Sequence, residues 1–496
     1  MDRRLRAGPD TGQRIFGIVG PMQRSDIPAR LDRLPWSRWH WRLVLALGVA
    51  WVLDGLEVTI VGSLGGVLER PDTLALSAAQ IGWSGSLYVG GAVIGAIVFG
   101  RLADRLGRKR LFLVTLLVYM LATVATAFST GFVSFAACRF ATGLGIGGEY
   151  AAINSAIDEL IPARVRGRVN LAINGSFWIG AALGALLSLF LLDARVLGPE
   201  TGWRAAFLLG AVMAVAILLV RRHVPESPRW LLAHGHAQEA ERVVAGIEAA
   251  VHGRAATATS AGALPPPARR ATVPSLGEVA HVLLRRYPQR SAVVLALMVS
   301  QAFFYNAIFF TYALVLTRFY AVDAARVGMF IFPFAAGNVL GPLLLGPLFD
   351  RIGRRRMIAA TYALSGVGLA LTGVGFLTDV LDATTQTLAW SAVFFMASAA
   401  ASSAYLTVSE VFPLEMRAIA ISIFYAVGTA VGGFAAPALF GVLIETGSRA
   451  NVFAGYLVGA VLVLAAAVVA LRWGVDAERK PLEEVAPPLG LGGREP

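Results

Sequence analysis

The chain has 496 residues, of which 56% are apolar and 15% are charged, whereas soluble domains carry about 25% charged residues. Its single cysteine, Cys138, excludes an intrachain disulfide and a cysteine-cluster metal site. The net charge of +12 does not indicate nucleic acid, because the arginines stand mainly in loops beside apolar runs, as on the inner side of membrane proteins. The composition therefore predicts an all-α polytopic protein in contact with the lipid bilayer, with no nucleic-acid partner.

The lysines and histidines limit the energy source and the cofactors. A phosphate-binding P-loop needs Gly-Lys-Ser/Thr, but both lysines, Lys109 and Lys480, follow an arginine. His234 and His236 stand in a polar loop, where solvated side chains are more common than metal ligands. We therefore expect no metal, no cofactor and an ion gradient in place of ATP.

The first half of the chain predicts a tail and six membrane spans. Residues 1–42 are Arg-rich and hold no apolar run long enough for a signal peptide, so they predict a cytoplasmic N-terminal tail. Residues 43–221 predict an N-terminal bundle of spans, each near the twenty or so residues that cross a bilayer. The spans are 43–64, 81–99, 111–128, 131–153, 169–192 and 203–220.

The second half predicts a linker, six further spans and a second tail. Residues 222–290 are charged and then Ala/Gly/Pro-rich over 253–274, which predicts a cytoplasmic linker with a short helix near 237–250. Residues 291–472 predict the C-terminal bundle, with spans 291–316, 327–348, 357–377, 388–409, 418–443 and 452–471. Residues 473–496 form a second tail, and the positive-inside pattern places both termini in the cytoplasm.

Two loop motifs occur once in each half. Asp104-Arg-Leu-Gly-Arg108 follows the second span, and Asp350-Arg-Ile-Gly-Arg354 follows the eighth. An E-x-x-P-x-x-x-R string follows the fourth span from Glu159 and the tenth from Glu410. Parallel repeats of six spans build transporters whose two halves rock around a site at the membrane midplane.

These motifs carry a family resemblance over roughly residues 40–475. The chain resembles the major facilitator superfamily through the repeated D-R-x-G-R loops. It resembles the sugar-transporter-like branch through Pro225-Glu-Ser-Pro-Arg-Trp230, Arg139-x-x-x-Gly143-x-Gly145-x-Gly147 and the two E-x-x-P-x-x-x-R loops. The resemblance implies twelve transmembrane helices in two six-helix repeats, and we expect a monomer.

Charged residues at the inner helix ends predict a gate network. Carboxylates favour helix N-termini and guanidinium groups favour C-termini, so such sets can hold helix ends together and separate when the gate opens. The alternative is that these charges only set the topology. The predicted network is Asp104, Arg105, Arg108, Glu149, Glu159, Arg166, Glu226, Arg229, Asp350, Arg351, Arg354, Glu410 and Arg417.

Three charges lie deep in predicted spans, where ionisable residues are costly and are functional candidates. Counted at 1.5 Å per residue, Asp54 and Glu57 lie about 16 and 21 Å deep in the first span. Arg139, in the fourth span, lies about 18 Å from the same surface. One arginine can neutralise one of two neighbouring carboxylates but not both, which suits proton binding and release. The alternative is a purely structural ion triad.

The first span adds a second resemblance. Asp54-Gly55-x-Glu57 resembles the D-G-x-D pattern of aromatic-acid:proton symporters, with Glu in the second acidic position. That resemblance implies proton coupling for Asp54, Glu57 and Arg139, and a substrate carboxylate for Arg139. The glutamate leaves open which acid carries the proton.

Polar and aromatic residues at a similar depth are candidates for substrate binding. Gln301-x-x-x-x-Asn306 resembles part of a sugar-porter motif, although Ser300 and Phe304 depart from it. An aromatic cavity with a few polar groups suits a planar or partly apolar solute, while the alternative for each aromatic residue is ordinary packing. The candidates are Arg139, Asn174, Trp178, Gln301, Tyr305 and Asn306.

The sequence thus predicts a secondary active transporter, not an enzyme, in the plasma (bacterial inner) membrane. We expect a proton-coupled symporter that moves a small carboxylated or aromatic metabolite by alternating access, with protons and the solute as partners. Three alternatives stay open: a sugar or polyol:proton symporter, a proton-driven drug or metabolite exporter, and a membrane sensor without transport.

Overall fold

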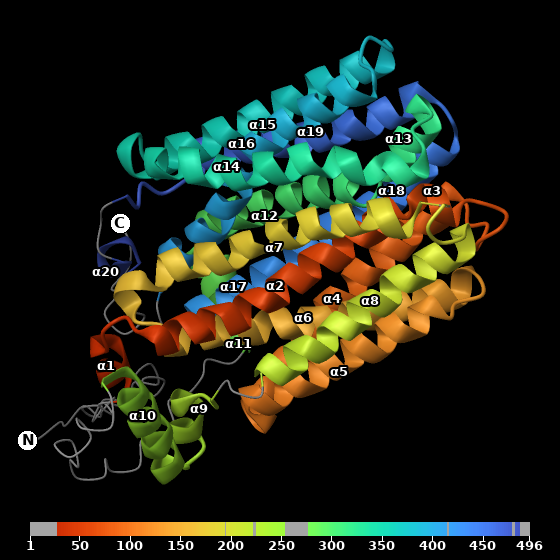
Figure 1. Cartoon of the computed structure of the whole chain (residues 1–496). Helices are drawn as coiled ribbons and strands as arrows, with labels where there is room; N and C mark the ends of the chain where they lie inside the picture. The colour runs from red at the N-terminus through yellow and green to blue at the C-terminus, as the bar shows by residue number, and fades with distance from the viewer. Residues whose placement is uncertain are drawn as a thin grey trace, which may run out of the picture.

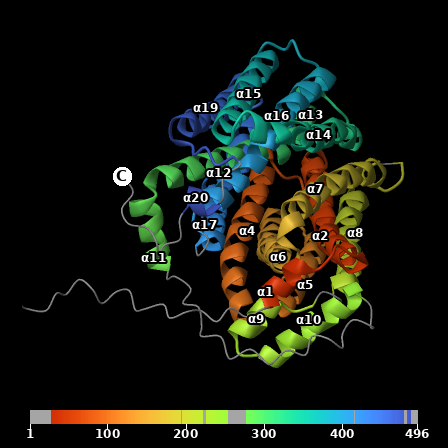
Figure 2. The same ribbon diagram turned by 90° about the vertical axis from the view of Figure 1, so that its left-hand side faces the viewer.

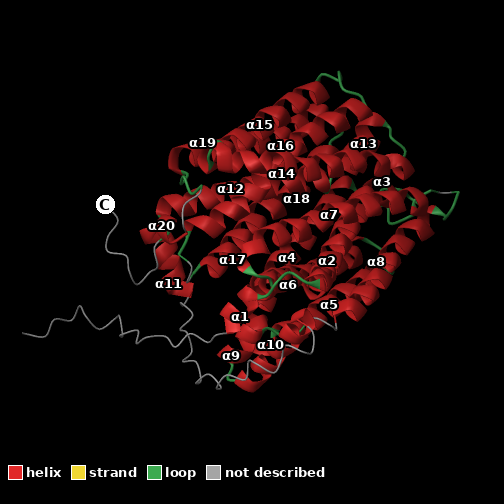
Figure 3. Ribbon diagram, turned by 60° about the vertical axis from the view of Figure 1, so that its left-hand side comes forward, coloured by secondary structure: helices red, strands yellow, loops and turns green. Residues whose placement is uncertain are grey.

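The computed structural model describes residues 27–193, 195–221, 225–252, 276–413, 416–478 and 482–486. Within these ranges every regular element is a helix (Figure 3). The long helices run side by side in two groups, one from each half of the chain (Figure 1, Figure 2).

The N-terminal half contains six long helices. They are α2 (Arg38–Ser63), α4 (Ala78–Leu106), α5 (Arg108–Ala127), α6 (Phe132–Leu160), α7 (Ala163–Leu191) and α8 (Pro199–Arg221), with the short α3 (Gly65–Leu68) between the first two. Each matches one of the six predicted spans and extends past it at one or both ends.

The C-terminal half repeats the pattern with two interrupted helices. Its elements are α12 (Pro288–Phe309), α13 (Tyr312–Tyr320), η3 (Ala324–Phe330), α14 (Ile331–Arg351), α15 (Arg354–Leu377), α16 (Ala383–Val411), α17 (Arg417–Gly428), η4 (Thr429–Gly433), α18 (Phe434–Glu445) and α19 (Arg449–Trp473). In the described part of the chain, nine helices are long and apolar enough to cross a membrane. Three further long helices, α6, α7 and α8, are not among these nine and have 29, 29 and 23 residues.

The remaining helices cluster at one end of the bundle (Figure 1). They are α1 (Ile27–Arg33), α9 (Pro228–Ala233), α10 (Ala237–His252), α11 (Leu276–His281), η2 (Val282–Arg286) and α20 (Leu482–Val485). We call this end the α10 end, and the opposite end, which carries α3 and α13, the α3 end. The helix predicted near 237–250 is therefore confirmed as α10.

The segment predicted as an N-terminal tail contains structure that the sequence analysis did not anticipate. Its last part forms α1, and α2 starts five residues before the predicted span. Apolar residues of α1 such as Leu31 share a buried cluster with Val244 and Ile247 of α10. Arg30 of α1 forms ion pairs of 2.6 and 2.7 Å with Glu241 and Glu248 of α10. Burial of apolar area against α10 stabilises this helix.

The seventh and eleventh spans are interrupted. Between α12 and α13 the chain leaves the regular helix at Phe310 and Thr311, and the Thr311 hydroxyl donates to the Ala307 carbonyl. In the eleventh span Pro437 has no N–H, so the carbonyl four residues earlier, at Gly433, lacks its usual donor. The π-helical turn η4 ends at that glycine.

Glycines allow the close helix contacts on which the buried site depends. A Cβ built at Gly55 of α2 would overlap the Phe177 carbonyl of α7, and one at Gly180 would overlap the Val52 carbonyl. The glycine string of α6 serves the same purpose against α4, since a Cβ at Gly143 would overlap a backbone carbonyl there. Small residues at such positions let membrane helices approach closely.

The internal repeat is visible in equivalent arginine contacts at the α3 end. Arg204, near the start of the sixth long helix, donates to the Ala127 carbonyl at the end of the third at 2.6 Å. Arg449, at the start of the twelfth, donates to the Phe376 carbonyl at the end of the ninth at 2.9 Å. Both guanidinium groups satisfy carbonyls that a helix C-terminus leaves without an intrahelical partner.

Candidate functional site

The centre of the N-terminal half holds a buried ion pair. Arg139 of α6 donates from Nη2 to Oε1 of Glu57 on α2 at 2.8 Å, and the side chains are only 2% and 4% exposed. The same nitrogen donates to the Thr142 hydroxyl at 2.8 Å. The sequence predicted a similar depth for these two charges, and the structure brings them into direct contact.

Aromatic rings enclose the guanidinium group of Arg139. Its carbon Cζ lies 4.9 Å from the ring centre of Phe207 on α8 and 5.6 Å from that of Tyr88 on α4. Cation–π contacts of this kind favour a cation that has lost its water. In this conformation Arg139 is therefore held by Glu57, Thr142 and two rings.

Asp54 has a different environment, although it lies one helical turn before Glu57. Its side chain is partly exposed, and Oδ1 accepts a hydrogen bond from the Tyr88 hydroxyl at 3.3 Å. Tyr425 of α17, in the other half, lies close enough to interact with the Asp54 charge. Among the described side chains Asp54 forms no ion pair. It lies at the interface between the halves, while Glu57 lies inside one half.

Glu149, assigned from the sequence to the inner gate network, lies nearer this site than that assignment implies. Its side chain is buried, at 7% exposure, and close enough to Asp54 for the two charges to interact. Glu149 is therefore part of the electrostatic surroundings of Asp54.

An aromatic layer lies beside the charges and connects the two halves. We define it as Tyr88, Trp178, Phe309, Phe310 and Phe434. Trp178 lies 6.1 Å from Phe309, and Tyr88 lies 5.9 Å from Phe310, measured between ring centroids. In each pair one ring comes from the N-terminal half and the other from the C-terminal half. Trp178, a predicted substrate residue, thus packs at the interface of the halves.

The halves also meet directly between this layer and the α3 end. The hydroxyl groups of Ser63 on α2 and Tyr312 on α13 are hydrogen bonded at 2.8 Å and buried. A Cβ at Gly62 would lie 2.9 Å from the Phe309 carbonyl, closer than side chains tolerate. The two backbones therefore approach as closely as glycine allows.

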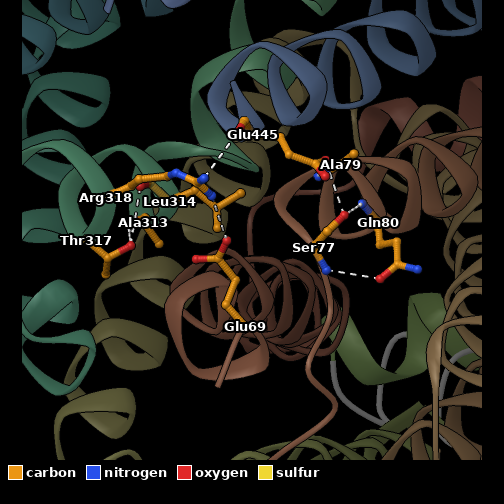
Figure 4. A network of polar contacts seen from close by, with 9 residues as sticks. All are labelled: Glu69, Ser77, Ala79, Gln80, Ala313, Leu314, Thr317, Arg318 and Glu445. Atoms are coloured by element: carbon orange, nitrogen blue, oxygen red, sulfur yellow. Dashed lines mark hydrogen bonds and ion pairs between the residues drawn. The ribbon is translucent and has the colours of Figure 1, made fainter. Parts of the chain in front are cut away.

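A polar network closes the α3 end (Figure 4). Arg318 of α13 pairs with Glu69, just after α3, at 3.4 Å and donates to the Glu445 carbonyl at 3.0 Å. The Glu445 carboxylate, at the end of α18, accepts from the Ala79 amide at 3.0 Å and from the Ser77 hydroxyl at 3.2 Å. These five residues, which we call the α3-end latch, join the halves twice. Burial raises the pKa of Glu69, although Arg318 acts in the opposite direction.

The predicted polar residues of the seventh span separate into two environments. Gln301 and Tyr305 line a small cavity inside the C-terminal half, together with Tyr362 and Ser365. The Tyr305 hydroxyl donates to Oδ1 of the buried Asn338 of α14 at 2.8 Å. By contrast, the Asn306 amide donates to the Ala302 carbonyl at 2.8 Å.

Asn306 lies nearer the interface of the halves. A Cβ at Gly433 would lie 3.1 Å both from Nδ2 of Asn306 and from Val89 of α4. Those predicted substrate residues whose side chains are described therefore do not share one closed pocket, and their roles stay predictions.

Part of the predicted gate network is visible in the C-terminal half. Arg354, at the start of α15, pairs with Asp350 at 3.0 Å and with Glu410 of α16 at 3.2 Å. Arg417 donates to the Phe412 carbonyl at 3.3 Å, and Arg351 is exposed. These contacts join helix ends within one half. The side chains of Asp104, Arg105, Arg108, Glu159, Arg166, Asn174 and Arg229 lie outside those that the structure describes.

Glu226 reveals a second repeated feature of the loops, one that the sequence analysis missed. Its carboxylate accepts from the Lys109 amide at 3.2 Å, at the N-terminus of α5. In the other half, Glu478 accepts from the Arg354 amide at 3.3 Å, at the N-terminus of α15. In each D-R-x-G-R loop the glycine, Gly107 or Gly353, has φ of +86° or +111°, which strongly favours glycine. A negative charge at a helix N-terminus is stabilising.

Sequence reasoning also missed Tyr88 and the α3-end latch. Tyr88 carries a hydroxyl group in the middle of the second predicted span, and that position could have identified it as a candidate site residue. Glu69 and Arg318 follow the first and seventh spans, which are equivalent in the repeat, and carry opposite charges. That pairing was visible in the sequence, but contact between the loops depends on which end of the molecule is closed.

Two six-helix halves around buried charges define a multi-pass membrane transporter of small molecules. Residues 61–486 match the family described as "Sugar (and other) transporter", and the chain belongs to this family of the major facilitator superfamily. A niacin transporter, NiaP of Acinetobacter baylyi, is 29% identical over 93% of this chain and 99% of its own. The 4-hydroxybenzoate transporter PcaK of the same organism is 25% identical over 90% and 94%.

The same fold occurs in solved structures. The inward open conformation of the xylose transporter XylE from E. coli has a TM-score of 0.69 against this chain. It covers 90% of this chain and 98% of its own, at 19% sequence identity. With this coverage the similarity extends across both halves.

Proposed function

We propose that this protein is a proton-coupled symporter that moves a small carboxylated or aromatic metabolite across the bacterial inner membrane by alternating access. The observation that carries the proposal is the unequal charge of the site, where one arginine meets two carboxylates. Within the group Asp54, Glu57 and Arg139, the carboxylates contribute two negative charges and the arginine one positive charge, so this group carries one negative charge in excess. Binding of one proton removes this excess.

The two ends of the molecule have different roles in the proposed cycle. In the proposed orientation the α10 end faces the cytoplasm, in line with the Arg-rich loops of the sequence. The α3 end then faces outward, where the aromatic layer, the Ser63–Tyr312 hydrogen bond and the α3-end latch hold the halves together. In this orientation the conformation is closed to the outside. Outward opening requires these contacts to break while the halves rock.

The aromatic layer and the relatives support the substrate class. A planar ring can stack on Trp178 or Tyr88, which face the interface of the halves, and both named relatives carry a ring-bearing carboxylate. Gln301, Tyr305 and Asn306 supply polar groups in the other half. Arg139 is enclosed by Glu57 and Tyr88 in this conformation. It therefore attracts a substrate anion through these two side chains, or contacts the anion directly after the side chains rearrange.

The proposed energy source is the proton gradient, without a bound cofactor, and the proposed working unit is the monomer. Each monomer contains both halves, so the rocking motion needs no second subunit.

Uptake by the purified protein in lipid vesicles tests the function. Radiolabelled nicotinate, 4-hydroxybenzoate and xylose are offered in turn, with an inward pH gradient, without one, and with a protonophore. Accumulation of a carboxylate that needs the gradient and disappears with the protonophore is the expected result. Accumulation of xylose alone would favour the sugar symporter. Binding without accumulation would favour a sensor, and movement against the proton flow would favour an exporter.

A further inference from the structure

We propose that Asp54 takes up the coupled proton, whereas Glu57 stays ionised throughout the cycle as the fixed counter-charge of Arg139. The inference rests on the proposed symport and assigns the coupled proton to one carboxylate, that of Asp54. The two acids have the same predicted role at the level of the sequence, and the structure separates them by their contacts.

The contacts of Glu57 oppose proton exchange. Its carboxylate is 4% exposed and lies 2.8 Å from a guanidinium group that is itself 2% exposed. Protonation of Glu57 would leave Arg139 charged, buried and without its carboxylate partner, which is strongly unfavourable. A proton would also have to cross the packed interior of the N-terminal half to reach it.

The contacts of Asp54 permit proton exchange. Its side chain is partly exposed at the interface of the halves, and its hydrogen-bond partner is the Tyr88 hydroxyl, at 3.3 Å. A hydroxyl can donate to a carboxylate and can accept from a carboxyl, so both protonation states of Asp54 keep this partner. No ion pair with a described residue has to break.

The titratable groups around Asp54 come from five helices. They are Glu57 on its own helix, Tyr88 on α4, Tyr119 on α5, Glu149 on α6 and Tyr425 on α17, with Arg139 of α6 behind Glu57 and Tyr88. Arg139 is already neutralised by Glu57, and Glu149 adds negative potential. An ionised Asp54 therefore repels any second anion at the interface of the halves.

This repulsion gives a physical reason for obligatory coupling. With Asp54 ionised, a substrate carboxylate would meet a like charge in a poorly solvated site, and binding is disfavoured. Once a proton has added to a carboxylate oxygen of Asp54, the repulsion is gone and the carboxyl O–H can donate to the substrate. The proton leaves the same oxygen after the halves have rocked and the substrate has departed. Proton and anion therefore bind together or not at all.

Two measurements on the purified full-length chain test the assignment. The first is the affinity for nicotinate between pH 6 and pH 10, where a free carboxylic acid with a pKa near 4 stays ionised. Nicotinamide, which has the same ring without the charge, is the matched ligand. The second is proton uptake on nicotinate addition, followed with a pH indicator in weak buffer. Both are made on the wild type, Asp54→Asn and Glu57→Gln.

In the wild type, nicotinate affinity is expected to fall up to about tenfold per pH unit, with about one proton taken up per ligand. In Asp54→Asn the affinity is expected to be independent of pH, with no proton uptake, and counterflow persists while gradient-driven accumulation is lost. Folded Glu57→Gln protein is expected to retain a pH-dependent affinity. Nicotinamide affinity is expected to vary much less with pH in every variant.

Proton uptake that persists in Asp54→Asn would overturn the assignment and leave the symport intact. The same holds if Glu57→Gln alone abolishes it. Should Glu57→Gln fail to fold, the Asp54→Asn result decides by itself, because that change breaks no ion pair. If neither nicotinate nor 4-hydroxybenzoate binds the wild type, the proposed substrate class fails first and this inference fails with it.

Discussion

The Glu57–Arg139 pair gives the sharpest prediction about stability. The perturbation is a double-mutant cycle of Glu57→Gln, Arg139→Gln and the double variant. Both side chains are at most 4% exposed, so solvent does not screen the charge that each single change leaves behind. Removal of one partner of a buried pair costs about 3–5 kcal/mol. At about 2–4 °C per kcal/mol for a bundle of this size, each single variant should melt about 6–20 °C lower.

The double variant should recover much of this loss, because it buries neither an unpaired cation nor an unpaired anion. Thermal unfolding of the purified proteins in one detergent, followed by intrinsic fluorescence, measures all four corners of the cycle. Glu200→Gln is the matched control, since Glu200 pairs with Arg204 at 3.5 Å but is 68% exposed and should change stability by less than about 1 kcal/mol. Additive losses in the double variant would refute the coupling between Glu57 and Arg139.

Three further predictions follow from the packing and from the α3-end latch. Gly55→Ala should destabilise the fold by about 1–3 kcal/mol and impair uptake, because the added Cβ meets the Phe177 carbonyl. Gly175→Ala, which has open space around the added Cβ, should do neither, and equal melting temperatures of the two variants would contradict this. Arg318→Ala should shift the halves toward opening at the α3 end by up to about fivefold, read from spin-label distances, while the exposed Arg326→Ala should not. Burial raises the pKa of Glu69 in the closed state, so a proton binds more tightly there and acidification should favour closure. Glu69→Gln should remove this pH dependence and match the acidic wild type at neutral pH, whereas the opposite sign would count against the burial argument.

The distinction between the two acids matters for how coupling is studied in this protein. Loss of accumulation in Glu57→Gln would show only that the buried pair is needed for an intact site. Proton uptake and the pH dependence of affinity respond to the group that titrates, so they separate a proton carrier from a residue that holds Arg139 in place.

Several features of the site were determined by the sequence alone, because they depend on distance along a helix. A rise of 1.5 Å per residue fixes the depth of Glu57 and Arg139 once the ends of their spans are known, and the structure places them in contact. The twelve apolar runs and the repeated D-R-x-G-R loops likewise fixed the architecture. A membrane span must satisfy its own backbone, so each apolar run can only become a helix.

Tertiary packing alone decided which acid meets the arginine and which end is closed. Asp54 and Glu57 are one turn apart, and the rotation of α2 that turns Glu57 to Arg139 is set by the contact of Gly55 with α7. The latch between Glu69 and Arg318 joins loops that are 249 residues apart in the chain. Helix periodicity carries no information about such pairs, because the relative position of the two halves depends on the contacts between them.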